Sequence, residues 1–256
     1  MKSNYKYEKS PLAQVICQLT FPTILRIENE EPFAFQEQIR EQFPIYQLTT
    51  NFSQEIQNEI LPPNIFVPPV LNSMKSHSFT SETGDSTVGL NKQAVSLTTN
   101  TYNSWYEFKN GFLLIQKVFE DKYRPSYYDR VGLRYINIID PYEIGLKELS
   151  WRELITPEFS GLFGADSKET EVIQFVSNQE IDLRNQTHLR ISTAKVLNTE
   201  NGHIGFQIDI DSFSNLMRTK SVEVSNLLEV LHCQIKKMFR KSITNKLHDL
   251  LNPVVF

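Results

Sequence analysis

Two arginines stand four residues apart in the segment DRVGLRYINIID, residues 129–140. Side chains alternate between the two faces of a strand, so a strand here places Arg130 and Arg134 on one face with Gly132 between them. Two guanidinium groups can grip a phosphate or carboxylate, and glycine permits its close approach. We therefore predict an anion site at Arg130, Arg134 and Tyr135. The alternative is that both arginines pair with carboxylates and organise the fold.

Two aspartates repeat this spacing near the C-terminal end of the sequence. Asp209 and Asp211 share one face of a strand predicted at 203–213, and Glu180 and Asp182 can do the same on another strand. If those strands are neighbours, the four carboxylates could form a divalent-metal site for phosphoryl chemistry. The ordinary alternative is a solvated sheet face whose acidic side chains discourage aggregation.

A basic cluster closes the helix predicted at residues 221–241. Lys236, Lys237, Arg240 and Lys241 follow one another without an intervening acid. They could bind a nucleic-acid backbone or an acidic partner protein. Cations at a helix C-terminus also complement the helix dipole, which is the simpler explanation.

The composition limits the classes of protein to consider. Of the 256 residues, 40% are hydrophobic and 22% are charged, which is enough apolar material for a core and argues against a disordered chain. The net charge of −4 lacks the positive excess typical of proteins that coat nucleic acid or membranes. Cys17 and Cys233 both fall in apolar patterns, which predicts unpaired thiols and a cytoplasmic location. No sequence motif indicates a cofactor, and no stretch is long enough for a membrane span.

Hydrophobic periodicity predicts an α+β fold with antiparallel strands covered by long amphipathic helices. The helices are expected at 105–121 and 221–241, with Ser104 and Glu107 as a capping box for the first. Strands are expected at 12–21, 77–84, 87–101, 129–140, 170–182, 187–197 and 203–213. Residues 44–72, which contain Pro62, Pro63, Pro68 and Pro69, are expected to form an irregular surface crossing.

The sequence allows two interpretations of the domain organisation. The composition favours a single domain over residues 1–256. A weak internal similarity links residues 115–119, IQKVF, with 235–239, IKKMF, and each segment lies in a predicted long helix. The chain could therefore consist of two similar packed halves, 1–145 and 146–256.

Two motifs resemble a sporadically distributed family of uncharacterised bacterial proteins of about this length. They are the N-terminal pattern PLxxVxCxLxFP, residues 11–22, and the central RVGLRYIN, residues 130–137. The similarity spans the whole chain. The resemblance implies no activity, cofactor or catalytic residue, and the patchy distribution of the family suggests accessory genes in mobile or defence-related settings.

These observations favour a non-catalytic binding or regulatory protein whose partner is another protein, with no cofactor. The alternatives are a metal-dependent hydrolase or nuclease that uses Asp209 and Asp211, and a nucleic-acid or anionic-ligand binder that uses the arginines or the lysine cluster. The oligomeric state is left open.

Overall fold

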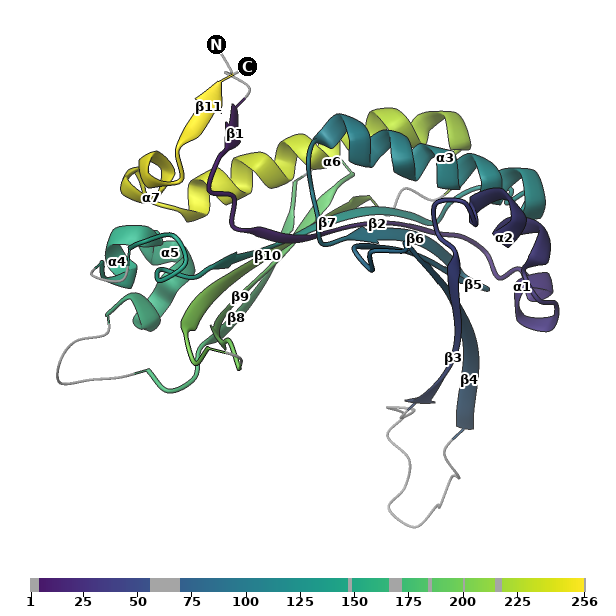
Figure 1. Ribbon diagram of the computed structural model, residues 1–256, viewed down its shortest axis with the longest axis horizontal. Coiled ribbons are helices and arrows are strands. Elements are labelled where there is room, and N and C mark those ends of the chain that lie inside the picture. The colour runs from purple at the N-terminus through teal and green to yellow at the C-terminus, as the bar shows by residue number, and fades with distance from the viewer. Residues whose placement is uncertain are drawn as a thin grey trace.

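Nine strands form one antiparallel sheet in the order β3-β4-β5-β6-β2-β7-β10-β9-β8, and helices lie along one of its faces (Figure 1). The computed structural model describes residues 5–55, 70–146, 149–165, 172–183, 186–199, 201–214 and 218–255. The chain is thus a mixed α/β protein with a large antiparallel sheet. Strands β3 and β4 bend away from the helices, so the sheet is curved (Figure 1).

Alternating apolar and polar residues build most of the strands. In β2 the side chains of Val15, Cys17 and Leu19 are buried, whereas the residues between them are partly exposed. The strands of the large sheet are β2 Leu12–Thr20, β3 Ile45–Glu55, β4 Val70–Thr80, β5 Ser86–Asn91, β6 Ala94–Thr99, β7 Arg130–Ile139, β8 Val176–Asp182, β9 His188–Leu197 and β10 Ile204–Ser214. Two further strands, β1 Tyr5–Tyr7 and β11 Pro253–Val255, pair near the chain ends.

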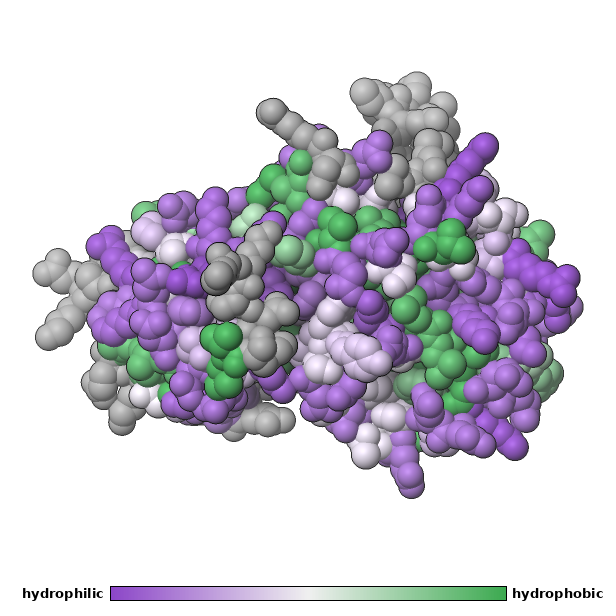
Figure 2. Space-filling model, turned by 90° about the horizontal axis from the view of Figure 1, so that it is seen from above, coloured by the Kyte–Doolittle hydropathy of each residue, from purple (hydrophilic) through white to green (hydrophobic). Residues whose placement is uncertain are grey.

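Two helices provide most of the cover over the sheet. They are α3, Trp105–Tyr123, and α6, Ser221–Ser242. Each buries a stripe of residues at helical spacing against the strands: Phe108, Phe112, Ile115 and Phe119 on α3, and Val224, Leu228, Leu231, Ile235 and Phe239 on α6. Seen from above, the outer surface is mainly hydrophilic, with hydrophobic residues in separate groups (Figure 2).

Shorter helices complete the fold. Helices α1 (Leu25–Asn29) and α2 (Phe33–Ile39) precede β3, and α4 (Trp151–Leu154), α5 (Pro157–Ser160) and the 3-10 turn η1 (Gly161–Ala165) follow β7. Helix α7 (Asn245–Leu250) precedes β11. Among the described residues, no helix is both long and apolar enough to cross a membrane.

Two sequence-based predictions of secondary structure are wrong. Residues 45–55 and 70–72, expected to be irregular, belong to strands β3 and β4, and the four prolines lie outside the described residues. The predicted strand 87–101 is two strands, β5 and β6, joined by a turn at Lys92 and Gln93. That turn has no glycine or proline to mark it. The turn at Gly84, with φ +78°, lies where it was expected.

Burial on α3 gives a direct test of the packing. Phe112 is fully buried, whereas Tyr106 on the same helix is 73% exposed. We expect Phe112→Ala to lower the free energy of unfolding by about 3–5 kcal/mol, because it leaves a cavity under the helix. Tyr106→Ala should change it by no more than about 0.5 kcal/mol. Urea unfolding followed by circular dichroism measures both; equal losses would show that α3 is packed differently.

Candidate functional site

Strand β7 carries apolar residues on one face and the two predicted arginines on the other. Val131, Leu133 and Tyr135 are buried, and Tyr135 bonds to α6. Arg130 and Arg134 therefore lie on the side of the sheet opposite α3 and α6, because side chains alternate along a strand. We call this side the open face.

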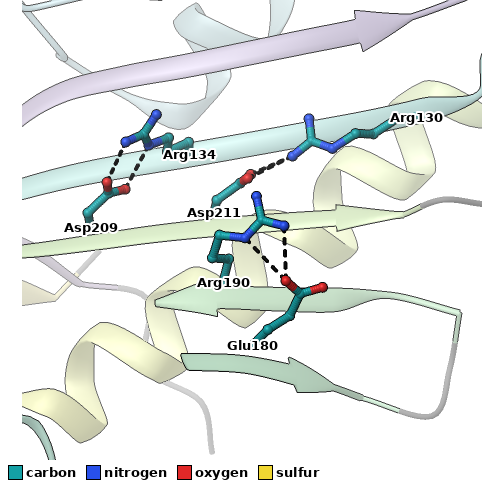
Figure 3. Close-up of polar contacts among 6 residues, drawn as sticks. All are labelled: Arg130, Arg134, Glu180, Arg190, Asp209 and Asp211. Carbon is teal, nitrogen blue, oxygen red and sulfur yellow. Dashed lines mark hydrogen bonds and ion pairs between the residues drawn. The ribbon is translucent and has the colours of Figure 1, made fainter. Parts of the chain in front are cut away.

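Three ion pairs cross four neighbouring strands on the open face (Figure 3). Nη2 of Arg130 donates to both carboxylate oxygens of Asp211, at 3.0 and 2.7 Å. Arg134 forms a two-point contact with Asp209, in which Nε donates to Oδ1 at 2.8 Å and Nη2 donates to Oδ2. Arg190 donates from Nε and Nη2 to Oε2 of Glu180 at 3.2 and 2.9 Å. These six residues are the ion-pair row.

The sign of the charge alternates from strand to strand. In the register of the sheet, Arg134 on β7 lies opposite Asp211 on β10, which lies opposite Arg190 on β9, which lies opposite Glu180 on β8. Opposite charges in facing positions stabilise a pair of strands, whereas like charges destabilise it. The alternating charges of the row therefore stabilise the strand order β7-β10-β9-β8.

Gly132 makes room for the side chain of Arg130. A Cβ at position 132 would lie 2.2 Å from Nη1 of Arg130, so the guanidinium occupies the space above the glycine. Cζ of Arg130 also lies 4.6 Å from the centroid of the Phe213 ring, and Cζ of Arg190 lies 5.5 Å from the same centroid. The absent side chain of Gly132 and the ring of Phe213 thus position Arg130 toward Asp211.

In the two ion pairs between β7 and β10 the carboxylate is less exposed than the arginine. The side chain of Asp209 is 7% exposed against 45% for Arg134, and that of Asp211 is 16% exposed against 23% for Arg130. Burial raises the pKa of Asp211, although Arg130 and two further arginines oppose the shift. The hydrogen bonds that Arg134 donates to Asp209 raise the pKa of its guanidinium. Each carboxylate is thereby held by a cation that stays charged.

The arginines keep hydrogen-bonding capacity after pairing. Within the described part of the chain, Nη1 of Arg130, Arg134 and Arg190 donates no hydrogen bond. A guanidinium has five N–H donors in a fixed plane. The row can therefore offer donors from positions that are already oriented, while its own charges are neutralised.

The contact between Gly132 and Arg130 leads to a mutational test. Gly132→Ala should push the guanidinium off Asp211 and lower the free energy of unfolding by about 1–2 kcal/mol. Gly111→Ala on α3 is the matched control. The nearest atom to its new methyl would be 3.8 Å away, so it should be neutral or stabilising by up to about 1 kcal/mol.

Urea unfolding of Gly132→Ala, Asp211→Asn and the double variant identifies the cause of that loss. If Gly132 acts through Arg130 and Asp211, the double variant should lose less than the sum of the two single losses. Strict additivity would contradict this positioning role.

Tyr135 lies apart from the arginines, on the face covered by α6. Its hydroxyl contacts Nδ1 of His232 at 2.9 Å and donates to the hydroxyl of Tyr102 at 3.3 Å. The imidazole of His232 stacks on Trp105 at 4.2 Å with an interplanar angle of 4°. Alternation along β7 separates Tyr135 from the two arginines, so it cannot join them around one anion; grouping it with them was wrong.

His232 is held in its neutral form by this environment. Its pKa is lowered to about 4, chiefly by burial and also by the cations Lys236 and Lys109, while Glu229 acts in the opposite direction. Lys109 and Trp105 both donate to Glu229, which joins α3 to α6 at this point. The cluster is an internal packing arrangement between the helices and β7.

The lowered pKa of His232 predicts how stability depends on pH. The unfolded chain takes up this proton near pH 6.5 and the folded chain only near pH 4. Stability should fall as the pH is lowered through this window, by up to about 3 kcal/mol. The loss should be smaller in His232→Phe, which has no imidazole to protonate. Urea unfolding at pH 7, 6, 5 and 4 measures it; parallel profiles would contradict the assignment.

The four acidic residues proposed as metal ligands do not gather. Strand β9 lies between β8 and β10, so Arg190 separates Glu180 from Asp211. Asp209 and Asp211 each pair with an arginine. Over the residues that the structure describes, no group of three or more potential metal-binding side chains occurs. The metal site required the two acidic strands to be neighbours, and that condition is not met, because β9 lies between them.

The basic cluster on α6 is divided by its contacts. Lys236 lies 5.5 Å from the centroid of the Tyr5 ring, and burial lowers its pKa. Arg240 donates to the backbone oxygen of Ile243 and to Asn245. Lys237 and Lys241 are exposed. Part of the cluster therefore supports the chain ends, and the exposed lysines remain accessible.

Two members of the site were missed from the sequence. Arg190 completes the alternation of charge, and Phe213 lies against the guanidinium groups of Arg130 and Arg190. Arg190 could have been found because it falls on the polar side of the predicted strand 187–197. Phe213 carried no such signal, because an aromatic residue at a strand end usually belongs to the core.

Comparison with protein-family models finds no model that matches the chain, and comparison with curated proteins finds no match either. The site must therefore be interpreted from its own geometry.

Proposed function

We propose that the chain is a non-catalytic binding or regulatory protein that holds a protein partner on its open face. The observation that carries this proposal is the ion-pair row: three arginines are fixed by carboxylates, yet the Nη1 of each donates no hydrogen bond to any described residue. Prepositioned donors lower the entropy lost when a partner binds. Carboxylates engaged by arginine are poorly suited to bind metal or to act as general bases.

The charges on the open face favour protein over nucleic acid as the partner. The ion-pair row has three cations and three anions, so it lacks the positive excess that attracts phosphate backbones. Arginine is also enriched at protein interfaces. The second candidate, binding of nucleic acid or another anionic ligand, is favoured by the exposed Lys237 and Lys241 at the end of α6.

We further propose that the protein acts in the cytoplasm as an accessory or defence-associated component, as the sequence resemblance implies. Its two cysteines are unpaired thiols, which suits a reducing compartment.

We also propose that the chain consists of two similar packed halves, residues 1–145 and 146–256. Strands β2 and β7 pair at the centre, each is followed by short helices and a run of antiparallel strands, and each run leads into α3 or α6. The matching segments 115–119 and 235–239 lie in these two helices.

A charge-swapped pair tests the binding role without removing an ion pair. In Glu180→Arg/Arg190→Glu the contact between β8 and β9 can re-form with reversed polarity, because both side chains are about half exposed. The swap also places a carboxylate opposite Asp211, so it breaks the alternation of charge along the row. The matched control is Arg26→Glu/Glu30→Arg, another exposed pair, associated with α1. We expect native mass spectrometry of the chain co-expressed with its genomic neighbours to show a bound protein in the wild type and control, and at least about tenfold less in the swap.

The outcomes separate the candidates. Equal retention by the swap would contradict binding through the ion-pair row. A bound oligonucleotide in place of a protein would support the second candidate. A wild-type chain with no bound mass would contradict a stable partner. Circular dichroism confirms that each variant is folded.

A further inference from the structure

Strand β8 is an edge of the sheet, and its hydrogen-bonding phase can be assigned. The amide of Lys195 donates to the carbonyl of Phe175 and the amide of Leu183 donates to that of Thr187, both at 3.0 Å. Bonded and non-bonded pairs alternate along an antiparallel ladder. Odd-numbered residues of β8 therefore bond to β9, and Asn178 and Glu180 direct their N–H and C=O groups toward the edge that no described strand pairs with.

The same even-numbered residues place their side chains on the open face. Among the described strands β8 pairs only with β9, and it continues the alternation of charge: β7 is basic, β10 acidic, β9 basic and β8 acidic. Strand β8 has two acidic residues, Glu180 and Asp182, and no basic residue. Oε1 of Glu180 accepts no hydrogen bond within the described part of the chain, and its side chain is 52% exposed.

We infer that the edge of β8 binds an extended basic segment of a partner protein by strand addition. This inference rests on the proposed binding function and identifies the chemistry of the partner. An added strand would take its main-chain hydrogen bonds from residues such as Asn178 and Glu180. Its basic side chains would face Glu180, and its apolar side chains would extend the opposite face, where Ile181 pairs with Leu189.

The charge pattern argues against a second copy of this chain as the added strand. Pairing β8 with itself would bring acidic Glu180 and Asp182 near the same residues of the copy, with no basic side chain on either strand. Like charges in facing positions destabilise paired strands. The edge therefore selects a strand of opposite charge.

A synthetic peptide tests the inference on the full chain. The probe is a blocked seven-residue peptide in which arginine and valine alternate, and the control peptide replaces arginine with glutamate. We expect the basic peptide alone to bind, measured by fluorescence anisotropy. Its affinity should fall about tenfold or more for Asn178→Pro, which removes an edge N–H that β9 does not use. Asn178→Ala, which keeps the N–H, should bind as the wild type does.

A charge variant separates main-chain pairing from attraction alone. Glu180→Gln should weaken binding of the basic peptide by several-fold, whereas Asn178→Pro weakens it with every charge in place. Equal binding by Asn178→Pro and Asn178→Ala, or no binding by the wild type, would overturn the inference. A partner that the native chain retains and the charge swap loses would still support the binding function, so the two failures can be distinguished.

Discussion

The pairing of β2 with β7 at the centre of the sheet fixes which side chains reach each face. Their register runs from Val15 opposite Tyr135 to Thr20 opposite Arg130. Because side chains alternate with a period of two, a slip of one residue would move Arg130 and Arg134 under the helices and bring Leu133 to the open face. Burial under α3 and α6 and charge pairing on the open face therefore specify the same register. Neither the core nor the ion-pair row could form without it.

The ion-pair row illustrates how a polar face can be well ordered without adding much to stability. Removing Asp209 and Asp211 from solvent costs free energy, and pairing with arginine mainly offsets that cost. Loss of one partner would leave a poorly solvated charge, so substitution of either residue of a pair is expected to destabilise the fold. Gly132 shows how local this requirement is, since its missing side chain provides the space that the Arg130 guanidinium fills. The row contributes chiefly to the choice of strand neighbours and to the orientation of its donors.

The sequence predicted the individual strands and helices better than it predicted which strands lie next to one another in the sheet. Alternation identified β2, β7 and β10, and helical spacing placed the segments that form α3 and α6. The face shared by Arg130 and Arg134 follows from the same rule, and their pairing with carboxylates was the alternative considered beside the anion site. Strand order could not be obtained, because any two of these amphipathic strands can pair. For that reason the sequence could not show that β9 separates the acidic strands, or that Arg190 belongs to the site. Tyr135 was grouped with the arginines by proximity in sequence, although alternation sends it to the other face.

The open face is also asymmetric along its length. The line of facing residues that contains Arg134 continues through Ile16 on β2 to Thr98, Thr87 and Thr80 on β6, β5 and β4. That half presents hydroxyl groups in register, whereas the half from β7 to β8 presents charges. A partner lying along this line of described residues would meet charged side chains only between β7 and β8. Electrostatic complementarity mainly sets orientation and specificity in an interface. The distribution of charge along the open face would thus favour one orientation of a bound partner, even though the sheet itself runs continuously from β3 to β8.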